Sequence, residues 1–82
     1  MIDESRLREA AREVVFQLVG SRVDDADALI SAGLIDSLSI VKLIGQIERK
    51  LDVVLPLEDV QPDDFDSVDL VVETFQRLAR AR

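Results

Sequence analysis

The stretch DSLSIVKLIGQIERKL, which runs from Asp36 to Leu51, decides the fold. Its apolar side chains recur at the spacing of one face of an α-helix: Ile40, Leu43, Ile44, Ile47 and Leu51. An aspartate followed by a serine also suits a helix start, because a side-chain oxygen there can accept a hydrogen bond from an unpaired backbone N–H group. The stretch therefore predicts a helix that begins at Asp36 or Ser37, ends near Leu51 and buries this stripe.

Two more helices are predicted, one on each side of this stretch. From Asp3 to Val19 a helical period joins the apolar positions Leu7, Ala10, Ala11, Val14, Val15 and Leu18. Gly20 suits the end of that helix. A last helix should run from Asp66 or Ser67 to Ala79, and it should bury Val68, Val71 or Val72, Phe75 and Leu78. Each of these amphipathic helices needs the others to cover its apolar stripe.

The connecting segments lack a sustained period. Residues 21–35 are predicted to form a long ordered loop whose middle, Leu29 and Ile30, packs on the core. Residues 56–60 fit a short helical turn that starts with a proline. Pro62 to Phe65 fits another turn, with the phenylalanine as its anchor.

A strand has weak support in this sequence. The segment of residues 52–55 is short and contains two adjacent β-branched valines, but no second strand is evident to pair with it, so we expect none. The fold class that follows is all-α. We expect a single domain over residues 1–82, built as a small antiparallel bundle of three longer helices plus one short helix.

Composition narrows the classes of function. The chain has no Cys and no His, so it lacks both a thiolate nucleophile and the usual base at neutral pH. Its net charge of −7 argues against binding of nucleic acid, because contacts with phosphates need Lys or Arg. No apolar run is long enough for a membrane span or a signal peptide. We expect a soluble, cytoplasmic protein whose partners are other proteins.

The segment from Gly33 to Leu38 carries the functional signal. Here the long loop delivers Ser37 to the first turn of the central helix, where backbone N–H groups are unpaired and the helix dipole favours an anion. We expect Asp36 to cap the same helix, and this role is compatible with a second one at the attachment site, as a contact for the modifying enzyme. Because the chain has no His, Ser37 lacks an activating base. The site therefore suits modification by an outside enzyme that brings its own base and metal ion.

Gly33, Asp36, Ser37 and Leu38 match the signature of the acyl and peptidyl carrier proteins, which this chain resembles over nearly its whole length. The resemblance implies a four-helix bundle in which a magnesium-dependent phosphopantetheinyl transferase moves 4′-phosphopantetheine from coenzyme A onto Ser37. It also implies that the chain is not an enzyme. Acyl or aminoacyl thioesters on the arm would pass from an adenylating ligase or acyltransferase to downstream synthase enzymes, and a monomer suits such a shuttle.

Two details refine the resemblance. Residues 55–57 and 64–68 look more like D-alanyl carrier proteins and the stand-alone carriers of polyketide or nonribosomal peptide biosynthesis, the pathways of many antibiotics. The carriers of fatty acid synthases have a strongly acidic second helix, whereas the second helix here is mixed to basic. We therefore expect a stand-alone carrier, with its cargo chosen by partner enzymes.

A second stripe of residues runs beside the buried one on the central helix: Leu38, Val41, Lys42, Gly45 and Arg49. In the carrier family the second helix docks onto partner enzymes, so the resemblance makes these five the candidate docking residues. Leu38 and Val41 would then be exposed, and the alternative is that they belong to the core. Gly45 would let a partner helix approach closely.

Two other interpretations compete with this one. Ser37 could be only a helix cap, in a docking or adaptor module that binds partners without a covalent arm. The acids near the last helix invite a calcium site, but they lack the central glycine and the alternation of calcium loops: Asp63, Asp64, Asp66 and Asp69. We expect no metal site, and a solvated acidic face that caps helices.

Overall fold

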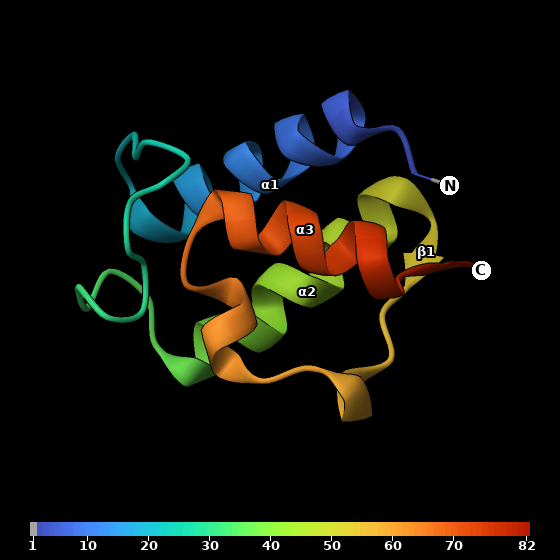
Figure 1. The fold of residues 1–82 in the computed structure, drawn as a ribbon. Coiled ribbons are helices and arrows are strands. Elements are labelled where there is room, and N and C mark those ends of the chain that lie inside the picture. Colours follow the sequence, from blue (N-terminus) through green and yellow to red (C-terminus); the bar gives the residue numbers. More distant parts are fainter. Residues whose placement is uncertain (1) are drawn as a thin grey trace.

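Over the part of the chain that the structure describes, three α-helices frame the molecule (Figure 1): α1 (Glu4–Val19), α2 (Ser37–Leu51) and α3 (Val68–Leu78). The computed structural model describes residues 2–82, and the molecule extends 31, 25 and 18 Å along its three principal axes. α2 and α3 both pack against α1. The predicted bounds of α2 are confirmed, and α1 and α3 lie close to theirs.

Local side chains define where the outer helices begin and end. Asp3 caps α1 by accepting a hydrogen bond from the backbone N–H of Ser5 at 2.9 Å. Ser67 caps α3 by accepting one from the backbone N–H of Leu70 at 3.1 Å. Gly20 ends α1 in the left-handed region, with φ at 85°, which costs a glycine little.

The core lies between the three helices. It buries the apolar positions that the helical periods predict: Leu7, Ala10, Ala11, Val14, Val15, Ile40, Leu43, Ile44, Ile47, Val68, Val71, Val72 and Phe75. Leu29, Leu55 and Phe65 join them from the connecting segments. Three predicted core residues at helix ends are only half-buried: Leu18, Leu51 and Leu78. Each fully buried large side chain contributes about 1.5–3 kcal/mol, so this core holds the helices in place.

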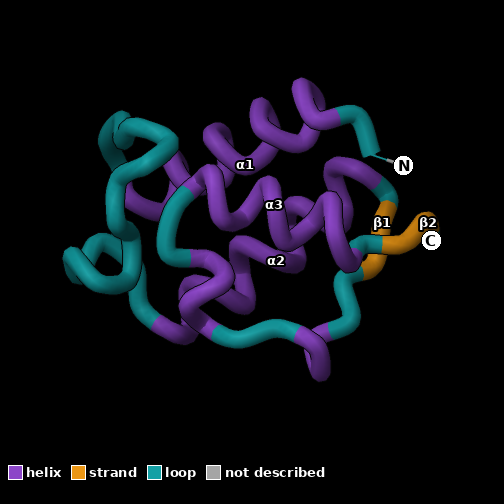
Figure 2. The backbone as a smooth tube through the Cα atoms, viewed as in Figure 1, coloured by secondary structure: helices purple, strands orange, loops and turns teal. Residues whose placement is uncertain are grey.

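The prediction that the chain has no strand is wrong. β1 (Val53–Val54) pairs antiparallel with β2 (Arg80–Ala81), and the register sets Val53 opposite Ala81 (orange in Figure 2). β2 escapes a search for strands because it is two residues long and has no apolar alternation. Its pairing depends on where α3 delivers the end of the chain, which is a tertiary property.

The turns predicted at residues 56–60 and 62–65 both form, but the one short helix of the predicted bundle does not form as an α-helix. Two 3-10 turns take its place, η1 (Leu57–Asp59) and η2 (Pro62–Phe65). Pro56 precedes η1, whereas Pro62 is the first residue of η2 and Phe65 is buried. Prolines at these positions lack the N–H groups that a continuous helix would need. The region therefore folds as two separate short turns, in agreement with the two turns that the local sequence predicts.

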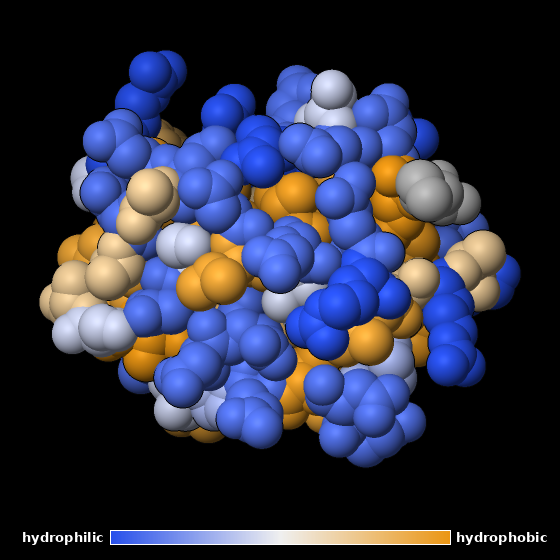
Figure 3. Space-filling view, in the orientation of Figure 1, coloured by the Kyte–Doolittle hydropathy of each residue, from blue (hydrophilic) through white to orange (hydrophobic). Residues whose placement is uncertain are grey.

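The surface seen in the orientation of Figure 1 is mostly hydrophilic, with apolar side chains visible in the seams between elements (Figure 3). Within residues 2–82, no helix combines the length and the apolar character needed to cross a membrane.

Candidate functional site

The loop of residues 20–36 leads from α1 to the start of α2, at the end of the molecule opposite the β1–β2 pair (Figures 1 and 2). Leu29 is fully buried in its middle. The Leu29 carbonyl accepts hydrogen bonds from the backbone N–H groups of Leu34 at 2.8 Å and of Ile35 at 3.1 Å. Gly33 makes the turn between them, with φ at 77°. The loop thus folds back on its own buried residue before it reaches α2.

Asp36 is the N-cap of α2, as predicted. Its carboxylate accepts a hydrogen bond from the backbone N–H of Ser39 at 2.8 Å. The pKa of the Asp36 carboxyl lies below its ordinary value. The main cause is the hydrogen bond from the backbone N–H of Ser39, and the hydrogen bond from the Ser39 side chain adds to it. Ser37 follows as the first residue of the helix, and it is exposed. The interpretation of Ser37 as the cap is therefore wrong, because Asp36 makes the capping bond.

The start of α2 fits an anionic group attached to Ser37. The first turn of the helix contains no acidic residue, and its backbone N–H groups carry a partial positive charge. The acid of α2 itself, Glu48, lies near the other end and accepts a hydrogen bond from the backbone N–H of Leu55 at 2.7 Å. A phosphodiester on the hydroxyl of Ser37 would thus meet favourable charge.

The second stripe of α2 lies at the surface. Leu38 and Val41 are 77% and 66% exposed, so the alternative that they belong to the core is wrong. Lys42 and Arg49 are also exposed. Gly45 is half-buried, and a Cβ added to it would meet no atom within 4 Å. The five residues together offer a face with two apolar side chains and two cations.

Asp66 has a contact that the sequence analysis missed. Its carboxylate accepts hydrogen bonds from three successive backbone N–H groups of the loop, those of Leu29, Ile30 and Ser31, and from the Ser31 hydroxyl. The prediction of a solvated, helix-capping acid is wrong here, because Asp66 is half-buried and Ser67 caps α3. The sequence holds no signal for this contact, because the loop and the acid are far apart along the chain.

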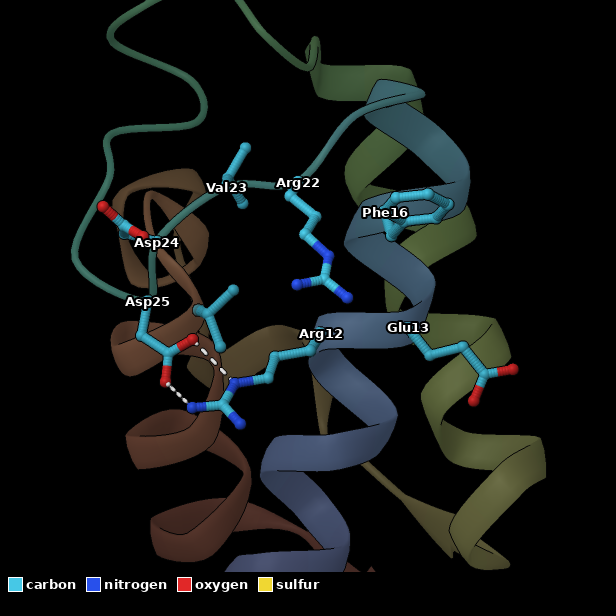
Figure 4. Close-up of a pocket in the computed structure, with 8 residues that line it drawn as sticks. Arg12, Glu13, Phe16, Arg22, Val23, Asp24 and Asp25 are labelled. Carbon is cyan, nitrogen blue, oxygen red and sulfur yellow. Dashed lines mark hydrogen bonds and ion pairs between the residues drawn. The ribbon is translucent and has the colours of Figure 1, made fainter.

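A second acidic contact ties the loop to both outer helices. Nη1 of Arg8 lies 2.7 Å from Oδ2 of Asp25 and 2.6 Å from Oδ1 of Asp69. Arg12 also donates two hydrogen bonds to Asp25, at 2.8 and 2.7 Å (Figure 4). The Arg12 hydrogen bonds, and then that of Arg8, lower the pKa of Asp25 to about 2.

Beside this network is a hollow of about 530 Å³ (Figure 4), lined by Arg12, Glu13, Phe16, Arg22, Val23, Asp24, Asp25 and Val68. Phe16 is 49% exposed at its edge. None of the predicted site residues lines this hollow. The predicted attachment and docking residues therefore lie together on α2, outside it.

Comparison with known proteins points to the same chemistry. Residues 5–75 match the family model described as the phosphopantetheine attachment site. The D-alanyl carrier protein of Streptococcus sanguinis is 30% identical over 71 residues, which is 84% of this chain and 90% of that protein. The D-alanyl carrier protein of Streptococcus mutans is 26% identical over 95% of this chain and 96% of that protein. The chain therefore belongs to the phosphopantetheine-binding carrier protein family, with covalently attached 4′-phosphopantetheine as its cofactor.

Proposed function

We propose that this chain is a non-catalytic carrier that holds an aminoacyl group as a thioester on 4′-phosphopantetheine attached at Ser37. The observation that carries the proposal is the exposed Ser37 at the first position of α2, directly after the Asp36 cap. The similarity to D-alanyl carrier proteins favours an aminoacyl cargo from an adenylating ligase over a polyketide intermediate.

In this function the chain provides the attachment site, and the transferase provides the catalytic groups. The Ser37 hydroxyl gives up its proton to a base of the transferase, since the chain has no His, and Asp36 holds the helix start in shape. The partial positive charge at the start of α2 then stabilises the phosphodiester. When bound, the arm supplies the thiol that the cysteine-free chain lacks.

Intact mass tests the attachment site. The chain is coexpressed with a broad-specificity phosphopantetheinyl transferase, and wild type should gain the mass of one arm. Ser37→Ala should gain none, whereas the matched control Ser39→Ala, changed two residues further along the same helix, should still gain it. A wild type without the arm, or an arm on Ser37→Ala, would overturn the assignment and leave the non-covalent adaptor as the function.

A loading assay tests the cargo. The purified holo chain is incubated with ATP, D-alanine and a D-alanine-activating adenylating ligase, and the mass of the aminoacyl adduct is followed. We expect an adduct on the holo chain and none on Ser37→Ala. Loading by a polyketide acyltransferase and not by this ligase would instead place the chain in polyketide biosynthesis.

We further propose that the exposed stripe of α2 docks onto the ligase, the transferase and the downstream enzymes. Lys50 pairs with Glu13 of α1 at 3.1 Å, but within residues 2–82 no carboxylate lies within ion-pair distance of Lys42 or Arg49. Together with the exposed Leu38 and Val41, these two cations fit an apolar partner surface with an acidic rim.

Two substitutions test this docking surface. Val41→Asp should raise the KM for loading while the free energy of unfolding changes by less than about 0.5 kcal/mol, since the side chain is exposed. Gly45→Ala should stabilise the helix by up to about 1 kcal/mol, because space is free for a Cβ, yet weaken docking. Loading that is unchanged by both substitutions would exclude this stripe.

A further inference from the structure

The carboxylate of Asp66 binds a single short piece of the loop from several sides. Oδ1 of Asp66 lies 3.1, 2.7 and 2.9 Å from the backbone nitrogens of Leu29, Ile30 and Ser31. Oδ2 accepts from the Ser31 hydroxyl, and the backbone carbonyl of Asp66 accepts a second bond from Leu29 N–H at 2.7 Å. Hydrogen bonds to an ionised carboxylate are the stronger kind, so this contact fixes the loop firmly.

The loop segment that Asp66 binds in turn fixes the residues that precede Ser37. The carbonyl of Leu29 accepts the backbone N–H groups of Leu34 and Ile35. Ile35 is buried and is followed at once by the Asp36 cap. A continuous series of contacts therefore runs from Asp66 through Leu29 to the residue before the cap. The turn η2, which ends at the residue before Asp66, contacts α2, which agrees with this path.

No simpler role explains the side chain of Asp66. It does not cap α3, because Ser67 makes that bond to Leu70. The acids near it have other contacts, since Asp64 accepts from the backbone N–H of Gln61 at 2.9 Å and Asp69 binds Arg8. Asp66 differs from these acids because it binds a segment that is distant in the sequence, with Ser31 lying 35 residues away.

We propose that Asp66 is a positioning residue for the attachment site: its carboxylate holds residues 29–35 in the conformation in which a transferase recognises Ser37. The inference rests on the proposed function of Ser37. When the hydrogen bonds of Asp66 to residues 29–31 are lost, only a fraction of molecules has both the loop and the start of α2 in the conformation that the enzyme binds. For an enzyme that binds only that form, the apparent affinity for the chain falls by the same fraction, while the turnover at saturation stays unchanged.

The test measures transfer of the arm to purified apo chains at varied chain concentration. Asp66→Asn keeps the size of the side chain but loses its charge and gives the Ser31 hydroxyl and the loop N–H groups a poorer acceptor. We expect its KM to rise by about tenfold with kcat unchanged. Asp63→Asn is the matched control, because it makes the same charge change on an exposed acid of the same turn, and its KM should equal that of wild type.

Hydrogen exchange provides a readout that does not depend on transfer. In Asp66→Asn the amides of Leu29, Ile30 and Ser31, and then those of Leu34 and Ile35, should exchange faster, while the amides of α1 keep their protection. Faster exchange throughout α1 would show general unfolding and overturn the positioning role.

The kinetic outcomes separate this inference from the proposed function. If wild type takes the arm and Asp66→Asn takes it with the same KM, or if Asp63→Asn is equally impaired, the positioning role is overturned and the function stands. A fall in kcat alone also overturns it. If wild type takes no arm, the proposed function fails and the positioning role fails with it, even where the exchange data show a released loop.

Discussion

The pair Asp-Ser occurs at the start of two helices, at residues 36–37 and 66–67, and the two copies serve opposite purposes. Before α2 the aspartate is the cap and Ser37 is an exposed first residue of the helix. Before α3 the serine is the cap and is 7% exposed, and Asp66 turns away to bind the loop. A shift of one residue in the cap therefore decides which serine keeps a free hydroxyl.

The residue after each serine explains the shift. Val68 is fully buried, so the start of α3 is drawn into the core and Ser67 comes with it. Leu38 is 77% exposed, so nothing draws the start of α2 inward. The comparison teaches that an Asp-Ser pair at a helix start does not by itself mark a modification site, because the packing of the next side chain sets its exposure.

The largest expected effect is a difference between the two serines in attachment of the arm. Ser37→Ala should abolish attachment of the arm, whereas Ser67→Ala should retain it, because the hydroxyl of Ser67 is buried and bound to Leu70. Intact mass after treatment with a transferase measures both. An arm that disappears with Ser67 and remains on Ser37→Ala would reverse the comparison.

Low pH should lower the free energy of unfolding, in part through the aspartates of both Asp-Ser pairs. Hydrogen bonds to the folded chain lower the pKa of Asp36 and Asp66, and the arginine contacts lower the pKa of Asp25 to about 2. The unfolded chain therefore binds more protons in acid, so the free energy of unfolding should be steady above about pH 5 and fall as the pH drops from about 4 towards 2.

Urea unfolding followed by circular dichroism at each pH measures this loss. In Asp25→Asn the fall towards pH 2 should be shallower, because one of the carboxylates that take up protons on unfolding is gone. A free energy of unfolding that rises as the pH is lowered would contradict the assigned directions of the shifts.

A smaller effect concerns stability: the two serines should contribute differently to the free energy of unfolding. Ser67→Ala removes the cap of α3 and should cost about 1 kcal/mol, and Ser67→Asp, which keeps a capping oxygen, should recover part of the loss. Ser37→Ala removes no capping bond and should change the free energy of unfolding by less than about 0.5 kcal/mol. Urea unfolding at neutral pH compares them, and equal losses would show that both serines act as caps.

The smallest expected effect concerns charge at the start of α2. Ser37→Asp places a negative charge where the modified serine would carry one, and the helix dipole should stabilise it by about 0.3–1 kcal/mol at low salt. The gain should shrink at high salt, because exposed charges are screened. Thermal unfolding at two salt concentrations measures the difference, and a destabilised variant would argue against an anion at this position.

Local spacing in the sequence predicted much of the structure. The period of Ile40, Leu43, Ile44 and Ile47 predicted the bounds of α2 and its buried face, because a helical repeat needs only nearby residues to be recognised. The Asp36 cap and the buried Phe65 followed from the same kind of local signal. The pairing of β1 with β2 could not be predicted, since its partners meet only after α3 has packed.

The sequence by itself determined that three amphipathic helices would share an apolar core and that Ser37 would stand at the start of the second one, because both properties depend on residues a few positions apart. Only the tertiary structure decided that Leu38 and Val41 lie outside the core and that Asp66 holds the loop before Ser37. The physical reason is distance along the chain: a carboxylate and the N–H groups that it binds 35 to 37 residues away become neighbours only when the helices have packed.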